Sequence, residues 1–164
     1  MTHLRRPRYC TPAVALLMAM AMACAQAQTP VLTTLQKISQ TATINLGHRE
    51  SSVPFSYYDN RRQVVGYSQD LMLAVTDSIQ RELKLPALAV KLVPVTSQNR
   101  IPLVQNGSVD LECGSTTHNR ERARQVAFSV SIFQTSSRLL THKDSGVTEL
   151  ADLSGRRVLV TAGT

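Results

Sequence analysis

Residues 67–95 read YSQDLMLAVTDSIQRELKLPALAVKLVPV, and this stretch decides the fold. Apolar side chains recur every four residues through its first half, which predicts a helix over 68–83 with one stripe facing a core. The stripe consists of Tyr67, Leu71, Val75, Ile79 and Leu83. Ser68 is a suitable N-cap for this helix, and Pro86 follows it as a stop signal. Residues 89–95 then alternate in polarity and predict a β-strand.

The same succession of strands and helices continues on both sides of this stretch. Residues 43–47 (TINLG) predict a strand before it, and residues 109–113 (VDLEC) predict a strand after it. Further strands are expected at 127–130, 136–141 and 157–160. Short helices are expected within 28–40, at 98–105 with Gly107 following, and at 119–126, and another helix is expected to end at 152–155. Residues 48–58 are predicted to be a loop, 59–62 a turn and 63–66 a short hairpin partner. Strands alternating with helices indicate an α/β fold with parallel strand pairs.

The N-terminus has the three parts of a secretory signal peptide. These are a basic region with Arg5, Arg6 and Arg8, an apolar run at 13–23, and the small-x-small pattern AQA at 25–27. The apolar run is shorter than the about 20 residues that a membrane span needs. We therefore expect residues 1–27 to be removed on export. Two variants stay open, a lipid anchor on Cys24 and twin-arginine export through Arg5 and Arg6.

The charge of the chain is mildly basic. Its 18 Lys and Arg residues against 11 Asp and Glu residues give a net charge of +7. Loss of the three signal-peptide arginines would leave 15 basic against 11 acidic residues, a net charge of +4. The remaining charges alternate in sign without a basic block, so nucleic-acid binding is not indicated. A mildly basic balance suits an anionic small ligand.

The sequence contains no recognisable catalytic or metal motif. It has no glycine-rich phosphate loop, no H-E-x-x-H, no cysteine pair at zinc spacing and no nucleophile elbow around its serines. We therefore expect no catalytic residue, no metal site and no cofactor. Cys113 is the one cysteine outside the signal region, so it is either a buried free thiol or has a partner that this chain lacks.

Three arginines share one kind of position. Arg49, Arg100 and Arg122 each follow a predicted strand, at a loop or a helix start. Hydroxyl residues accompany them, namely Ser51, Ser52, Thr96, Ser97 and Ser115–Thr117. Ligands of open α/β sheets bind at the carboxyl ends of the strands, and guanidinium groups with hydroxyls hold carboxylates there. The pattern predicts an anion site.

Four segments together resemble a known family. They are HRESSVPFSYYDNRRQVVGYSQD (48–70), TSQNRIPL (96–103), DLECGSTT (110–117) and ERARQVAFS (121–129). Their order and sequence are similar to the periplasmic glutamate/aspartate-binding proteins of ABC importers, within the polar amino-acid solute-binding family 3. The resemblance runs from about residue 43 to the last residue. It implies the type II periplasmic-binding-protein fold, in which two α/β lobes joined by hinge strands close on a ligand.

The resemblance also implies a domain organisation. Residues 28–42 would be a lead-in, residues 43–138 would form most of the first lobe, and residues 139–164 would begin the second. The hinge would lie near 136–140. On this comparison the chain is expected to be an N-terminal fragment, and we expect its isolated product to be unstable or unable to bind ligand.

Site roles follow from the resemblance position by position. Arg122 would hold the α-carboxylate of the ligand, and Ser115 and Thr117 would meet its α-carboxylate and α-ammonium. The side-chain carboxylate would be clamped by Arg49, Ser97 and Arg100, and Thr164 would face the ligand from the T-x-G-T turn of the second lobe.

The implied function is the binding of L-glutamate or L-aspartate in the periplasm and its delivery to the membrane permease of an ABC importer. A monomer without nucleic-acid partners is expected. Two alternatives stay open. The first is a dehydratase of the same fold acting on a prephenate-like dicarboxylate, with Glu50 as the candidate general acid. The second is a ligand-binding sensor module.

Overall fold

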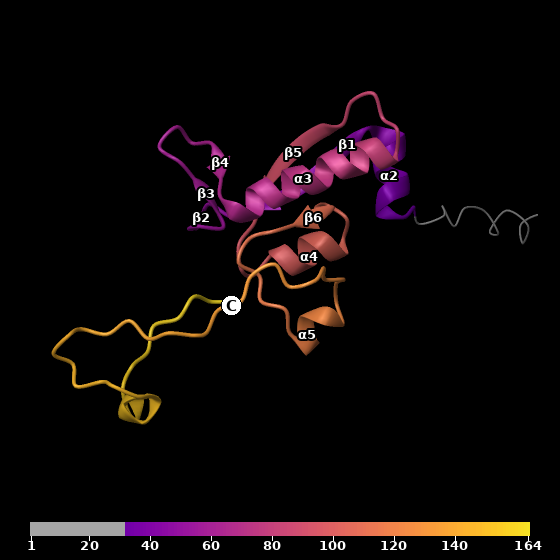
Figure 1. Cartoon of the computed structure of the whole chain (residues 1–164). Coiled ribbons are helices and arrows are strands. Elements are labelled where there is room, and N and C mark those ends of the chain that lie inside the picture. The colour runs from indigo at the N-terminus through magenta and orange to yellow at the C-terminus, as the bar shows by residue number, and fades with distance from the viewer. Residues whose placement is uncertain (1–31) are drawn as a thin grey trace, which may run out of the picture. The chain divides into compact units, whose positions relative to one another are not determined.

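The computed structural model describes residues 32–164, so the predicted signal peptide lies outside the described residues. Figure 1 shows the elements along the chain. The helices are α2 (Thr34–Thr41), α3 (Tyr67–Glu82), α4 (Arg100–Gln105), α5 (Arg120–Ala123) and the short 3₁₀-helix η1 (Leu150–Leu153). The strands are β1 (Thr43–His48), β2 (Ser51–Ser52), β3 (Ser56–Tyr58), β4 (Val64–Val65), β5 (Ala89–Pro94) and β6 (Leu111–Glu112).

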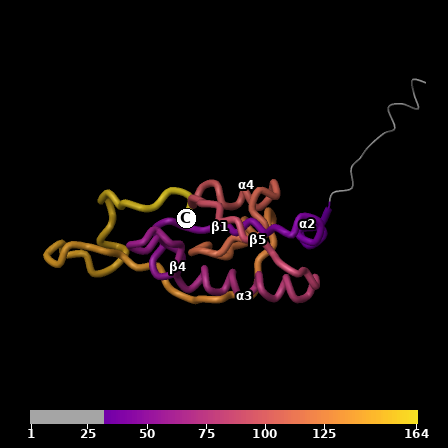
Figure 2. The backbone as a smooth tube through the Cα atoms, turned by 90° about the horizontal axis from the view of Figure 1, so that it is seen from above, coloured from indigo at the N-terminus to yellow at the C-terminus, as the bar shows by residue number. Residues whose placement is uncertain are grey.

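The central sheet has three parallel strands in the order β5-β1-β6. The strands predicted at 43–47, 89–95 and 109–113 are therefore confirmed, with β6 shorter than expected. The connection from β1 to β5 carries α3 and the connection from β5 to β6 carries α4. Helices α3 and α4 lie on opposite sides of the sheet (Figure 2). This arrangement brings the carboxyl ends of all three strands to one edge, as the α/β prediction required.

Helix α3 forms where the apolar repeat predicted it, but a different face of it is buried. The inward side chains are Ser68, Gln69, Met72 and Thr76. Tyr67 and Val75 of the predicted stripe are 43% and 45% exposed, whereas Ile79 and Leu83 pack against the core. A row of residues spaced by four winds around a helix of 3.6 residues per turn, so such a row meets the sheet only along part of its length.

Ser68 is not the N-cap of α3 as predicted. Gly66 occupies that position, and no side chain caps the helix there. The Ser68 hydroxyl instead donates a buried hydrogen bond of 2.9 Å to the carbonyl oxygen of Gly114. The residue that looked like a local capping signal therefore joins the start of α3 to the loop after β6.

The small core lies between α2, the sheet and α3. Its buried apolar side chains are Ile38, Ile44, Leu46 and Met72. Asp110, before β6, ties this core together, because its carboxylate pairs with Lys37 of α2 at 2.7 Å and accepts the backbone N–H of Asn45 in β1 at 2.9 Å. The helix predicted within 28–40 is confirmed as α2 and has Thr33 as its N-cap.

The segment after β1 is more regular than a loop. Strands β2, β3 and β4 form a second, antiparallel sheet within the region predicted to be loop and hairpin. The turn at 59–62 is confirmed, and Asp59 holds it by accepting the backbone N–H groups of Arg61 and Gln63. The two- and three-residue strands are too short to leave an alternating pattern in the sequence.

The strands predicted at 127–130, 136–141 and 157–160 are wrong in this structure. The chain has no regular secondary structure in these three segments, and Leu140 and Leu159 are almost fully exposed. An apolar, β-branched sequence favours an extended backbone, but a strand exists only where a neighbour supplies the hydrogen bonds. The helices predicted at 98–105, 119–126 and 152–155 are found as α4, α5 and η1. None of the helices within residues 32–164 is long and apolar enough to cross a membrane.

Candidate functional site

The loops at the carboxyl ends of β1, β5 and β6 are bound to one another. The Arg49 guanidinium, which directly follows β1, donates from Nε to Ser52 Oγ at 3.2 Å and from Nη1 to the Val95 carbonyl oxygen after β5 at 3.1 Å. The Ser115 hydroxyl, after β6, lies 3.4 Å from Ser52 Oγ. Three segments that are distant in the sequence therefore form one polar surface at this edge.

Arg49 is held at its backbone as well as at its side chain. Its N–H donates to Ser56 Oγ at 2.9 Å, and Ser56 is fully buried in β3. The short antiparallel sheet therefore has a role in the site, because it fixes the direction in which Arg49 leaves β1.

Arg100 is the most unusual side chain of the site. It is the first residue of α4 and is only 2% exposed, yet its Nε and Nη1 atoms have no hydrogen-bond partner. Burial lowers the pKa of the Arg100 guanidinium below its ordinary value. The charge of Glu112 acts to raise this pKa, and the charges of Arg122 and Arg49 lower it further. Buried polar groups are normally paired, so unpaired donors on a buried cation point to an anionic partner.

Arg122 lies on α5, whose N-cap Asn119 accepts the Arg122 backbone N–H at 2.8 Å. Its guanidinium donates from Nη1 to the Thr117 carbonyl oxygen at 3.0 Å and from Nη2 to the Gly163 carbonyl oxygen at 2.9 Å. The turn at 161–164 therefore lies against Arg122. Arg122, which the resemblance assigns to a ligand carboxylate, therefore donates from Nη1 and Nη2 to backbone oxygens in this structure.

The structure brings the three predicted arginines together. Charge interactions with both Arg49 and Arg122 act on Arg100. Ser97 lies beside the turn at 161–164, because a Cβ added to Gly163 would stand 3.0 Å from the Ser97 carbonyl group. Thr117 contacts Arg122 through its carbonyl oxygen, and its side chain is exposed. The hydroxyl of Thr164 is engaged with the Thr161 carbonyl oxygen at 2.8 Å.

One acidic residue belongs to the site although the sequence reasoning did not select it. Glu112 ends β6, and its Oε2 accepts the Thr116 hydroxyl at 2.7 Å while its buried Oε1 has no partner. Burial raises the pKa of this carboxyl above its ordinary 4.5, and the Thr116 hydrogen bond and the three arginines reduce the rise. The available signal was an acidic residue inside a predicted buried strand.

An open hollow of about 620 Å³ is lined by Arg100 and Glu112, whereas Arg49 and Arg122 do not belong to its lining. Arg100, Glu112 and the loop at 114–117 line its polar part, and Phe55 and Phe133 line part of its apolar side. The two phenylalanine rings pack edge to face with centroids 4.9 Å apart. The hollow can therefore take a small molecule that has charged groups and a short apolar body.

The residues outside this cluster offer little other chemistry. Residues 32–164 contain no group of three or more His, Cys, Asp or Glu side chains that could hold a metal ion. Cys113 is a half-buried free thiol, and burial raises its pKa above its ordinary 9.0, which makes the reactive thiolate rarer.

Comparison with known proteins gives the class to which this arrangement belongs. Residues 44–157 match the bacterial extracellular solute-binding proteins, family 3, and the chain belongs to this family. A solved ancestral amino acid-binding protein, described as a precursor of cyclohexadienyl dehydratase, is 30% identical with a TM-score of 0.53. The match covers 60% of this chain and 40% of that one. The fold is that of a type II periplasmic binding protein, represented here by part of a lobe.

Two curated relatives are more similar in sequence. The glutamate/aspartate import solute-binding protein of Salmonella typhimurium is 56% identical over 131 residues, which are 80% of this chain and 43% of that protein. Its namesake in Escherichia coli K12 is 51% identical over 163 residues, which are 99% of this chain and 53% of that protein. The chain thus spans about half the length of the curated relatives it matches.

Proposed function

We propose that this chain carries the arginine-rich half of a binding site for an acidic amino acid, L-glutamate or L-aspartate. The observation that carries the proposal is the convergence of Arg49, Arg100 and Arg122 at the carboxyl edge of a parallel sheet. Arg100 adds the strongest argument, because a 2% exposed guanidinium with two unpaired nitrogens favours a carboxylate partner. The names of the relatives support the same ligand class.

The charges give the site its selectivity. A dicarboxylic amino acid brings two carboxylates and one ammonium, so Arg122 can meet the α-carboxylate while Arg49 and Arg100 meet the side-chain carboxylate. Ser97, Ser115, Thr117 and Thr164 supply hydroxyls or backbone groups around them. Glutamine has an amide in place of the second carboxylate and would leave a buried guanidinium without a counter-charge. A mismatch of this kind costs several kcal/mol, on the order of 2–5.

Calorimetric titration of the full chain with glutamate, aspartate, glutamine and arginine tests the ligand class. The resemblance led us to expect that the isolated chain cannot bind ligand. Because Arg49, Arg100 and Arg122 come together within this chain, we propose instead that it binds glutamate or aspartate and neither of the other two. Equal heats for glutamine and glutamate would contradict the assignment of the side-chain clamp.

The role of Arg122 is tested by Arg122→Ala with Arg124→Ala as a matched control. Arg124 is exposed, is two residues further along the chain and has no side-chain hydrogen bond. We expect Arg122→Ala to weaken glutamate binding by about 2–5 kcal/mol, because it unpairs a carboxylate, and Arg124→Ala to leave it unchanged. Equal affinities of the two variants would remove Arg122 from the site.

We further propose that the protein acts in the periplasm as the substrate-binding component of an ABC importer and hands its ligand to a membrane permease. Residues 43–138 would belong to the first lobe and residues 139–164 to the second. N-terminal sequencing of the exported product tests the targeting step. A mature chain starting at Gln28 supports a cleaved signal peptide, whereas a blocked, lipid-modified Cys24 supports the lipoprotein variant.

We propose that the chain binds its ligand without transforming it. Glu50, the carboxylate considered as a general acid, is exposed at the end of the loop after β1, and solvent would compete for any proton it held. Incubation with prephenate tests this: unchanged substrate is expected, and formation of a dehydrated product would show an enzyme instead.

A further inference from the structure

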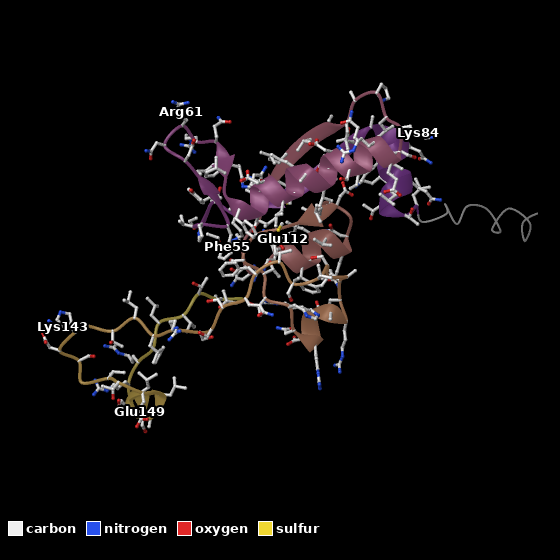
Figure 3. All side chains as sticks on the ribbon, in the orientation of Figure 1. Phe55, Arg61, Lys84, Glu112, Lys143 and Glu149 are labelled. Carbon is white, nitrogen blue, oxygen red and sulfur yellow. The ribbon has the colours of Figure 1, made fainter. Side chains whose placement is uncertain are left out.

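Glu112 differs from Asp110, the acidic side chain two residues before it. Asp110 pairs with Lys37 at 2.7 Å, whereas the buried Oε1 atom of Glu112 has no partner. In Figure 3 Glu112 lies among the packed elements near Phe55, which lines the same hollow, whereas Arg61, Lys84, Lys143 and Glu149 lie at the periphery. Its stem lies against β1, since a Cβ added to Gly47 would stand 3.2 Å from Glu112 Cγ. This contact with β1 restrains the stem of Glu112 on its strand.

The carboxylate and the arginines are neighbours without being paired. A Cβ on Gly114 would stand 2.6 Å from Arg49 Cγ and 3.1 Å from Glu112 Oε1, so both side chains lie against this one glycine. Arg100 and Arg122 also act on Glu112 through their charges. Among residues 32–164, however, no ion pair of 4 Å or less joins Glu112 to an arginine. Arg100 thus keeps two nitrogens unpaired although the Glu112 carboxylate acts on it through its charge.

The unpaired atoms of Glu112 and Arg100 indicate that the carboxylate balances the charge of the guanidinium groups. Glu112 Oε1 and the Arg100 Nε and Nη1 atoms are buried without partners. An ionised Glu112 lowers the cost of keeping several guanidinium groups close together. When the carboxylates of a ligand reach those guanidinium groups, they balance the positive charge in place of Glu112. They also add negative charge next to the Glu112 carboxylate. The ionised form of Glu112 then loses its stabilisation.

We propose that Glu112 is the counter-ion of the arginines while no ligand is bound, and that it takes up one proton from solvent when a dicarboxylic amino acid binds. This inference rests on the proposed function and deepens it. No covalent step is involved: a proton moves from the buffer to a Glu112 carboxylate oxygen, and the net charge of the filled site increases by one. Glu112 is thereby a positioning residue that acts through the arginines.

The surroundings of Glu112 agree with this role. Charged groups reach it from three elements: Arg49 after β1, Arg100 on α4 and Arg122 on α5. Cys113 follows it on β6, and His118 lines the same hollow. Desolvation raises the pKa of Glu112, and the negative charge of a bound ligand would raise this pKa further.

The test is calorimetric titration of the full chain with glutamate at pH 6, in two buffers with different heats of ionisation. The carboxylates of free glutamate are ionised at this pH, so uptake reports on the protein. We expect net proton uptake by the native chain and affinity that rises as the pH falls from 7.5 to 5.5, by at most about tenfold per pH unit. Glu112→Gln should bind with no such uptake and a flat pH profile.

Glu50→Gln is the matched control, because it removes the same charge from an exposed position and should retain the uptake. Persistent uptake in Glu112→Gln, or none in the native chain, would overturn the proposal. If Glu112→Gln does not fold, His118→Gln decides: retained uptake supports Glu112, and lost uptake assigns the proton to the histidine. Failure of the native chain to bind glutamate at all would instead contradict the proposed function.

Discussion

At the scale of single residues, the site depends on charged groups that lie at least partly buried, where desolvation disfavours their charged forms. Arg100 is buried with unpaired donors, and Glu112 is half-buried with an unpaired acceptor, its buried Oε1 atom. Each would be costly alone, because burial disfavours the charged form of both. They are tolerated together because each compensates the other without closing into an ion pair, and a ligand can therefore still compete for the arginine.

Gly114 lies against both Arg49 and Glu112, and a substitution there provides a prediction. In Gly114→Ala the new methyl group would stand 2.6 Å from Arg49 Cγ, so the Arg49 side chain must shift. We expect glutamate affinity to fall by about 1–3 kcal/mol, the usual cost of overpacking, with the fold retained. Calorimetric titration and a thermal melt measure the two effects separately. A native-like melt with unchanged affinity would show that Arg49 is not needed where it lies.

At the scale of elements, parallel pairing assembles the site. Strands β1, β5 and β6 end at one edge, and the loop that follows each contributes an arginine or a hydroxyl. The short antiparallel sheet of β2, β3 and β4 supports this edge through Ser56. Gly66 links that sheet to α3 and has a φ of +122°, a region that side chains with a Cβ rarely adopt.

Gly66→Ala should therefore destabilise the junction. A Cβ there would stand 2.5 Å from the Phe55 carbonyl oxygen and 2.7 Å from that of Pro54, and neither backbone atom can move away easily. Gly107→Ala is the control, because Gly107 also has a positive φ, +74°, but has open space around it. We expect a loss of about 1–2 kcal/mol for Gly107→Ala and a larger loss for Gly66→Ala in urea unfolding. Equal losses would show that the contact with Phe55 is unimportant.

At the scale of the whole molecule, the ionisation of Glu112 links stability to pH. A carboxyl whose pKa is raised on folding binds its proton more tightly in the folded state. Its contribution to stability is therefore fully present below the unfolded value, about 4.5, and is lost as the pH rises through the folded pKa. The opposite sign holds for Asp152, whose pKa is lowered by the Thr148 and Glu149 backbone N–H groups, but that effect lies below its ordinary 3.8.

We expect the midpoint of thermal unfolding of the ligand-free chain to fall between pH 4.5 and neutrality more steeply than that of Glu112→Gln. Glu50→Gln should follow the native chain. Melting curves at matched ionic strength measure this difference. Parallel curves for the native chain and Glu112→Gln would mean that Glu112 ionises as freely in the folded as in the unfolded chain.

Much of the fold could be predicted because β1, β5 and α3 each have a local pattern of apolar and polar residues. The alternation in residues 43–47 and 89–95 predicts β1 and β5, and the apolar repeat of residues 68–83 predicts α3. The arginines could be predicted as a group because each follows a predicted strand, and parallel strands end together. The face of α3 that is buried, the role of Ser68 and the place of Glu112 could not, because they depend on which surface each side chain meets after folding.

From the sequence alone one could derive β1, β5, α3, the α/β class with parallel strands and the family, since these follow from periodicity, strand ends and ordered motifs. The tertiary structure decided that Glu112 joins Arg49, Arg100 and Arg122, and that residues 127–130, 136–141 and 157–160 do not form strands. The physical reason is the same in both cases. Desolvation and the hydrogen bonds between strands both depend on which residues are neighbours in space. A pattern along the chain does not show which residues those are.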